Sequence, residues 1–197
     1  MKNRFLSVCF VLLVSTLISS CFFGYYGNGD IVKQERAVRD FKSIELTGVG
    51  DIYIYPGNEF KVIVITDSNL QNYVSATAIG KNLRIKQTSN INFNPTEFAI
   101  EVYLPELESV SMSGAGYIEI CDGKATDLNI EVSGSGAINT LQYEVENITI
   151  DLSGAGSAKL WATKSIKGSI SGVGNVKYKG NPTLNVDVSG MGKFGPL

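Results

Sequence analysis

A short glycine motif recurs along most of the chain and constrains the fold more than any other feature of the sequence. The motif is Ser/Thr-Gly-x-Gly, and its six copies contain Gly48, Gly50, Gly114, Gly116, Gly134, Gly136, Gly154, Gly156, Gly172, Gly174, Gly190 and Gly192. From Ser113 onward the copies start 20, 20, 18 and 18 residues apart, and Thr47 lies 66 residues upstream of Ser113. This regular spacing is typical of a structural repeat in which each unit packs on the previous one.

Apolar residues alternate with polar ones on both sides of each motif. In the third copy, Leu128, Ile130 and Val132 precede the serine and Ile138 follows the second glycine. A period of two on both sides of a glycine pair predicts strand, corner and strand, with one face buried throughout. Because the chain after the first twenty residues shows no helical period, we expect an all-β domain with almost no helix.

Two architectures can use such units, an antiparallel meander or a parallel coil. Identical corners lie above one another only in the coil, at a spacing of about 4.8 Å. Parallel crossovers are right-handed as a rule, and the six-residue rhythm of left-handed coils is absent. We therefore predict a right-handed parallel β-helix, a single-stranded solenoid of about eight coils of 18–22 residues, with three of them between Thr47 and Ser113.

The motif glycines have a structural and a functional interpretation. As repeat corners, they provide a positive φ or a close approach of successive backbones. As part of a phosphate-binding loop, they would have to precede the N-terminus of a helix. Because β-type alternation follows every copy, the sequence favours structural corners.

The N-terminus is typical of an exported lipoprotein. Lys2 and Arg4 precede an uncharged apolar stretch, which ends in Leu17-Ile18-Ser19-Ser20-Cys21 and resembles the bacterial lipobox. The alternative is an ordinary secreted protein with a chance cysteine after its signal. We predict a signal peptide over 1–20, a lipidated Cys21 with a flexible tether over 21–40, and the β-helix domain over 41–197. Acylation at Cys21 would hold the protein on a membrane of the bacterial cell envelope, with the outer membrane expected.

Composition and charge argue against several classes of function. The formal net charge is −2 and no basic cluster occurs along the sequence, which argues against nucleic acid as a partner. The chain contains no histidine, so Cys121 has no imidazole to activate it, and the other two cysteines belong to the signal and the lipid site. We predict no catalytic residue, no metal and no cofactor.

The glycine motifs and their flanks resemble a known family. The segment from Phe41 to Ile52 and the repeated Val-Ser-Gly-x-Gly are similar to the auto-transporter adhesin family called the head GIN domain, over about residues 38–197. The resemblance implies a right-handed β-helix related in shape to pectin-lyase-like solenoids, a role in cell adhesion and no established catalytic residues. A literal Gly-Ile-Asn is absent, and the nearest form is Gly136-Ala137-Ile138-Asn139.

Three functions remain open. The first is a membrane-anchored, non-catalytic interaction module for cell adhesion or envelope binding, with a protein or polysaccharide ligand. The second is a polysaccharide-binding or polysaccharide-degrading protein. Degradation requires clustered carboxylates together with Arg or Lys, often around calcium; the candidate acids are Glu119, Asp122, Asp127, Glu131 and Asp151. Their alternation with apolar residues indicates solvated outward positions instead. The third is a structural or sensory envelope protein.

Overall fold

The computed structural model describes residues 24–88 and 92–197, and within them nearly all regular structure is β-strand. The elements in chain order are β1 (Gly24–Tyr26), β2 (Ile31–Arg36), β3 (Ser43–Pro56), β4 (Lys61–Asp67), the 3-10 helix η1 (Gln71–Tyr73), β5 (Val74–Ile79), β6 (Asn82–Gln87), β7 (Asn92–Asn94), β8 (Phe98–Leu104), β9 (Ser109–Ile120), β10 (Gly123–Gly134), β11 (Ala137–Asn139), β12 (Tyr143–Gly154), β13 (Ser157–Gly172), β14 (Asn175–Lys179), β15 (Thr183–Gly190) and β16 (Lys193–Pro196). The predicted all-β class is therefore confirmed.

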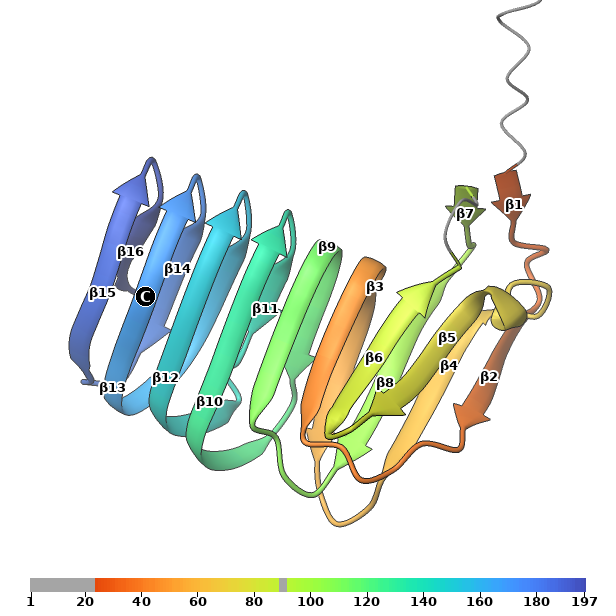
Figure 1. The fold of residues 1–197 in the computed structure, drawn as a ribbon, viewed down its shortest axis with the longest axis horizontal. Coiled ribbons are helices and arrows are strands. Elements are labelled where there is room, and N and C mark those ends of the chain that lie inside the picture. The colour runs from red at the N-terminus through yellow and green to blue at the C-terminus, as the bar shows by residue number, and fades with distance from the viewer. Residues whose placement is uncertain (1–23, 89–91) are drawn as a thin grey trace, which may run out of the picture.

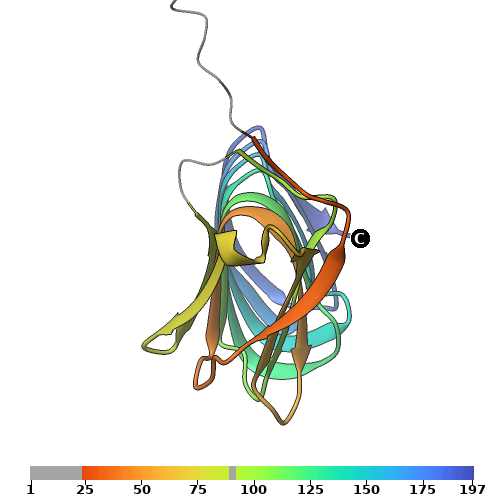
Figure 2. The same ribbon diagram turned by 90° about the vertical axis from the view of Figure 1, so that its right-hand side faces the viewer.

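The alternation in the sequence sets which side chains form the core. Along β10, Leu128, Ile130 and Val132 are buried, while Asn129 and Glu131 are exposed. Successive side chains of a strand point to opposite sides, so every second residue enters the interior. Figure 2 shows the strands of the two sides enclosing this interior, which is filled almost entirely by aliphatic residues.

Equivalent motif residues lie side by side on neighbouring parallel strands. Ser133 of β10 pairs with Ser153 of β12, which pairs with Ser171 of β13, and Ser171 pairs with Ser189 of β15. Figure 1 shows these strands running in one direction next to one another. The repeat step of 18 to 20 residues is thus the length of chain needed to return to the same position one strand further on.

The prediction of a right-handed β-helix solenoid is wrong, because the strand pairing closes into a ring. β9 pairs with β10, β10 with β12, β12 with β13, β13 with β11, and β11 again with β9. The result is a closed parallel β-barrel of five strands, with further strands bonded outside it. The ring closes because a long strand bonds two neighbours: β9 uses 109–112 for β10 and 117–119 for β11.

The predicted number of about eight coils is also wrong, because no coils lie between the first two motifs. Thr47 and Gly48 of β3 pair directly with Ser113 and Gly114 of β9, across the 66-residue interval. Within the interval, β6 and β8 pair in parallel with β3, whereas β4 pairs antiparallel with β8 and β5 antiparallel with β6. β2, which precedes the first motif, adds an antiparallel pair with β4. These strands lie together at one end of the molecule (Figure 1), where the glycine motif is absent from the sequence.

Part of the segment predicted as a flexible tether forms strands. β1 pairs in parallel with β7, and β2 pairs with β4 through six consecutive residue pairs from Ile31 to Arg36. The predicted signal peptide and Cys21 lie outside the described residues. Over the ranges that are described, no helix is long and apolar enough to cross a membrane.

Candidate binding faces

The motif glycines lie where successive backbones approach closely. Gly154 ends β12 with a φ of 138°, and a Cβ atom added to it would lie 2.5 Å from the carbonyl oxygen of Gly134 on β10. That oxygen accepts a hydrogen bond from the amide of Ala155 at 3.0 Å. At this position, therefore, both the backbone conformation and the space favour glycine. The other motif glycines occupy the corresponding places in β3, β9, β10, β13 and β15 or directly after them.

The candidate catalytic residues that the sequence disfavoured, Cys121 and the acids, are dispersed in the structure. Cys121 is a free, half-buried cysteine, and burial raises the pKa of its thiol. Glu119 lies on the second half of β9, whereas Asp127, Glu131 and Asp151 lie on β10 and β12 of the opposite side. In residues 24–88 and 92–197, no group of three or more His, Cys, Asp or Glu side chains is placed to hold a metal ion.

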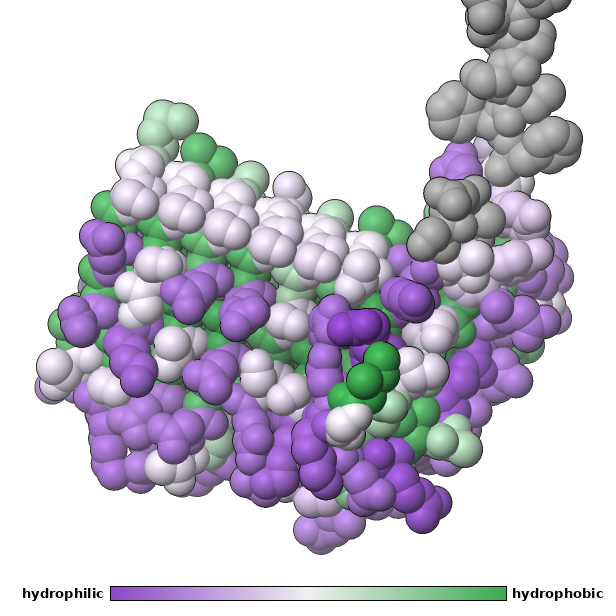
Figure 3. Space-filling view, viewed as in Figure 1, coloured by the Kyte–Doolittle hydropathy of each residue, from purple (hydrophilic) through white to green (hydrophobic). Residues whose placement is uncertain are grey.

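One outward surface, the hydroxyl face, is formed by β10, β12, β15, the first halves of β3 and β9, and the second half of β13. Two adjacent rows of residues run across it, one of hydroxyls and one mainly of carboxylates: Thr47, Ser113, Ser133, Ser153, Ser171 and Ser189; and Glu45, Ser111, Glu131, Asp151, Ser169 and Asp187. Figure 3 shows this face. A shallow groove of about 480 Å³ lies over the rows.

Two of the four carboxylates of the hydroxyl face accept hydrogen bonds from neighbouring side chains. Ser169 donates to Asp151 at 2.7 Å, and Glu45 accepts from Arg84 at 3.1 Å and from Asn82 at 2.7 Å. Burial disfavours the charge of Glu45, but the bonds from Arg84 and Asn82 outweigh it and lower the pKa of that carboxyl. The face is therefore an ordered polar surface whose acids are already paired where they are most buried.

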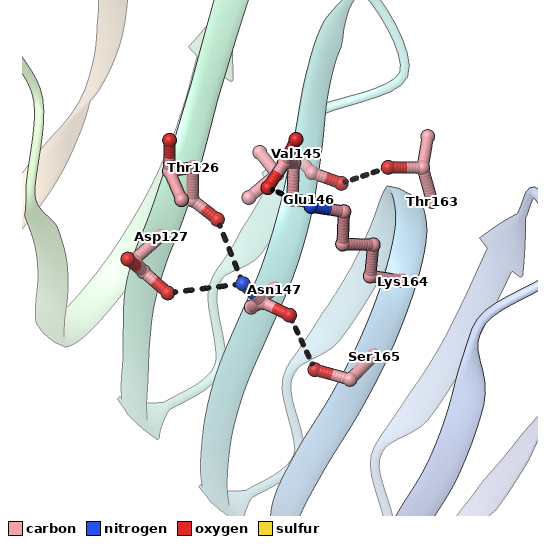
Figure 4. A network of polar contacts seen from close by, with 8 residues as sticks. All are labelled: Thr126, Asp127, Val145, Glu146, Asn147, Thr163, Lys164 and Ser165. Carbon is pink, nitrogen blue, oxygen red and sulfur yellow. Dashed lines mark hydrogen bonds and ion pairs between the residues drawn. The ribbon is translucent and has the colours of Figure 1, made fainter.

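Polar contacts also join the strands near the lower edge of the hydroxyl face (Figure 4). Asn147 of β12 donates to Asp127 of β10 at 3.2 Å and accepts from Ser165 of β13 at 2.9 Å, while Lys164 pairs with Glu146 at 2.6 Å. The edge also borders a groove of about 670 Å³ that contains several glutamates. Lys124 in its lining pairs with Glu144, and Lys42 pairs with Glu106 and Glu108, so part of the negative charge of the groove is offset.

The opposite surface, the lysine face, has a different chemistry at each end. It is formed by β8, β11, β14, β16, the second halves of β3 and β9, and the first half of β13; β11, β14 and β16 lie behind β10, β13 and β15 in Figure 1. One end carries tyrosines: the rings of Tyr55 and Tyr103 stack with centroids 4.9 Å apart, and Tyr53 meets Tyr117 edge to face at 6.5 Å. The other end carries Lys159, Lys177, Lys179 and Lys193.

These four lysines form no ion pair within the described residues. Lys179 lies over the ring of Trp161, with Nζ 3.5 Å from its centroid, and donates to the carbonyl of Leu141. Lys177 donates to the carbonyl of Pro196, while Lys159 and Lys193 are exposed. The absence of a basic cluster along the sequence therefore does not extend to the surface. The cluster could not be seen along the sequence because its members are up to 34 residues apart. The one sequence feature that could have indicated it is a lysine three residues after the second glycine in two copies of the motif.

The chain is thus an all-β protein with a closed parallel barrel and in-register rows of outward side chains. The family model described as "Putative auto-transporter adhesin, head GIN domain" matches residues 40–122 and 109–182. The two matches together cover most of the chain, so the chain belongs to this family.

Two solved structures of similar fold are described as putative adhesins. A putative adhesin from Bacteroides fragilis NCTC 9343 superposes with a TM-score of 0.63 at 18% identity, covering 88% of this chain and 100% of that one. A putative adhesin from Parabacteroides merdae ATCC 43184 superposes with a TM-score of 0.47 at 18% identity, covering 88% of this chain and 99% of that one. The first likeness supports the fold alone. None of the curated proteins matches the chain.

Proposed function

We propose that the protein is a lipid-anchored, non-catalytic adhesion module of the bacterial cell envelope, held at the membrane by Cys21. The observation that carries the proposal is the set of outward side chains held in register on parallel strands, on both faces of the barrel. Such rows offer many equivalent weak contacts to a repetitive or extended ligand, which gain strength together. Membership of an adhesin family supports the same role.

The non-catalytic part of the proposal rests on the dispersal of the reactive groups. A catalytic site needs a nucleophile or acid within hydrogen-bond reach of a base. The thiol of Cys121 is half-buried with a raised pKa, and the candidate carboxylates are divided between two faces. The anchoring part rests on the lipobox-like sequence before Cys21, three residues upstream of the start of β1.

Palmitate labelling tests the anchor. We expect the wild-type chain to incorporate radioactive palmitate and to partition into detergent, and Cys21→Ala to lose both properties, because the thiol is the site of acylation. Cys121→Ala is the matched control and should label like wild type. Labelling of Cys21→Ala at the wild-type level would contradict the anchor.

Adhesion of protein-coated beads to cells tests the proposed adhesion function. Beads coated with the purified chain should attach to bacterial or cultured animal cells several times more often than beads coated with albumin. Equal attachment of both kinds of bead to every cell type would contradict an adhesion role.

A further inference from the structure

We propose that the lysine face binds an acidic polysaccharide, whose carboxylates pair with Lys159, Lys177 and Lys193. This inference rests on the proposed function and names the ligand class of one of its faces.

Among residues 24–88 and 92–197, no acid forms an ion pair with the lysines of this face. Lys159 and Lys177 are direct partners on β13 and β14, so their backbones lie about 4.8 Å apart. Lys193 lies one row away on β16, where it pairs with Asn175, two residues before Lys177. Like charges on adjacent strands are unfavourable for folding. The nearest acid along the same row is Glu119, which is separated from Lys159 by Asn139. A polyanion lying across these strands would offset the repulsion.

Neutral hydrogen-bonding groups lie beside the lysines. Ser157 on β13 pairs with Asn175 on β14, which pairs with Lys193 on β16. Hydroxyl and amide side chains can both donate to and accept from sugar hydroxyls. Further along, Asn139 donates to the hydroxyl of Tyr117 at 3.0 Å, which places an aromatic ring at the border of the basic area. Lysines interleaved with hydroxyl and amide groups match a sugar chain that carries both carboxylates and hydroxyls.

The same face is less suited to phosphate polymers. Its cations are lysines, and the arginines of the described chain, Arg36, Arg39 and Arg84, lie on other segments. Arginine presents the planar fork that matches phosphate, whereas lysine acts as a point charge. On the hydroxyl face, Glu131, Asp151 and Asp187 would repel a polyanion, so we expect binding on one side of the molecule only.

Calorimetric titration of the full chain in detergent with polygalacturonate tests the inference. Lys159→Gln/Lys177→Gln should weaken binding about tenfold, because each exposed charge pair contributes up to about 1 kcal/mol and 1.4 kcal/mol is tenfold. The control, Lys124→Gln/Lys164→Gln, removes the same charge from lysines that already pair with Glu144 and Glu146, and should change affinity less than twofold. Raising the salt from about 50 to about 200 mM should weaken wild-type binding. Urea unfolding of both variants checks that they fold.

Three results would overturn the inference. The first is equal affinity for neutral dextran, and the second is equal loss of binding in both double variants. The third is a difference between the variants for double-stranded DNA or phosphatidylglycerol vesicles but not for polygalacturonate. Since bead adhesion is measured separately, a protein that adheres without binding polygalacturonate would refute the ligand class and leave the proposed function standing.

Discussion

At the scale of single residues, the close approach of successive backbones leaves no space for a side chain at the motif glycines. Gly134, Gly154 and Gly172 are in register on β10, β12 and β13. The carbonyl of each is approached by the next backbone, as in the bond from Val173 to Gly154 at 3.0 Å. A side chain here would have to enter the space of a neighbouring main chain, which cannot move without breaking its own hydrogen bonds.

Substitution of one such glycine should therefore destabilise the fold. We expect Gly154→Val to lower the free energy of unfolding by at least about 1 to 3 kcal/mol, the cost of backbone strain alone, because valine rarely adopts a φ near 138°. Urea unfolding followed by circular dichroism measures the loss. The control, Ser157→Val, places the same side chain at an outward position of β13 and should cost little. Equal stability of the two variants would show that the glycine is dispensable.

At the scale of elements, one buried carboxylate ties together segments at the antiparallel end. Asp67, the last residue of β4, has no exposed surface. It accepts hydrogen bonds at 2.7 Å from the amides of Gly29, before β2, and Thr96, before β8. Burial disfavours the charged form, but these bonds outweigh it and lower the pKa of Asp67 below its ordinary value of 3.8. The carboxylate thus fixes two loops relative to the barrel.

The lowered pKa of Asp67 predicts a dependence of stability on pH. A carboxyl whose pKa is depressed on folding stabilises the native state above pH 3.8, and this contribution is lost as pH falls through the lower pKa of the folded state. We expect Asp67→Asn to lower the free energy of unfolding by about 1.5 to 3 kcal/mol at pH 7, because hydrogen bonds to a charged carboxylate are replaced by bonds to a neutral amide. The difference from wild type should shrink well below pH 3.8.

Urea unfolding at pH 7 and near pH 2.5 measures this dependence. Asp187→Asn is a suitable control, because Asp187 is exposed on β15 and its loss should leave the stability at both values close to wild type. If Asp67→Asn lowers the free energy of unfolding equally at both pH values, the charge of Asp67 does not contribute to stability.

At the scale of the whole molecule, stability should vary with the number of bonded neighbours. β12 is hydrogen-bonded on both sides, to β10 and β13, and its inward side chains are buried. Among the described strands, β15 is bonded only to β13, and most of its residues are exposed. Strands inside the ring can open only by breaking contacts on two sides at once.

Hydrogen exchange followed by mass spectrometry should therefore separate these strands. We expect peptides from β12 to exchange at least about tenfold more slowly than peptides from β15, because opening β15 breaks fewer contacts. Uniform exchange across both strands would indicate that the barrel opens in a single global step.

Some features of this protein follow from local sequence alone. Alternating residues such as Leu128, Ile130 and Val132 predict strands with one buried face, because a strand points successive side chains to opposite sides wherever it lies. The same alternation placed the serines and carboxylates outward. The register of successive glycine motifs from Ser133 onward also follows from their even spacing, since equal steps return the chain to equal positions.

Strand pairing, by contrast, was decided by the tertiary structure. The same alternation fits parallel and antiparallel neighbours, so it could not reveal that Thr47 pairs directly with Ser113, that β4 runs antiparallel to β8, or that β11 closes a ring. The lysine face has the same origin: Lys159, Lys177 and Lys193 are distant along the chain and meet only because parallel strands set them on one surface. Local sequence carries little information about which distant segments form backbone hydrogen bonds with one another. Those bonds determine which side chains become neighbours.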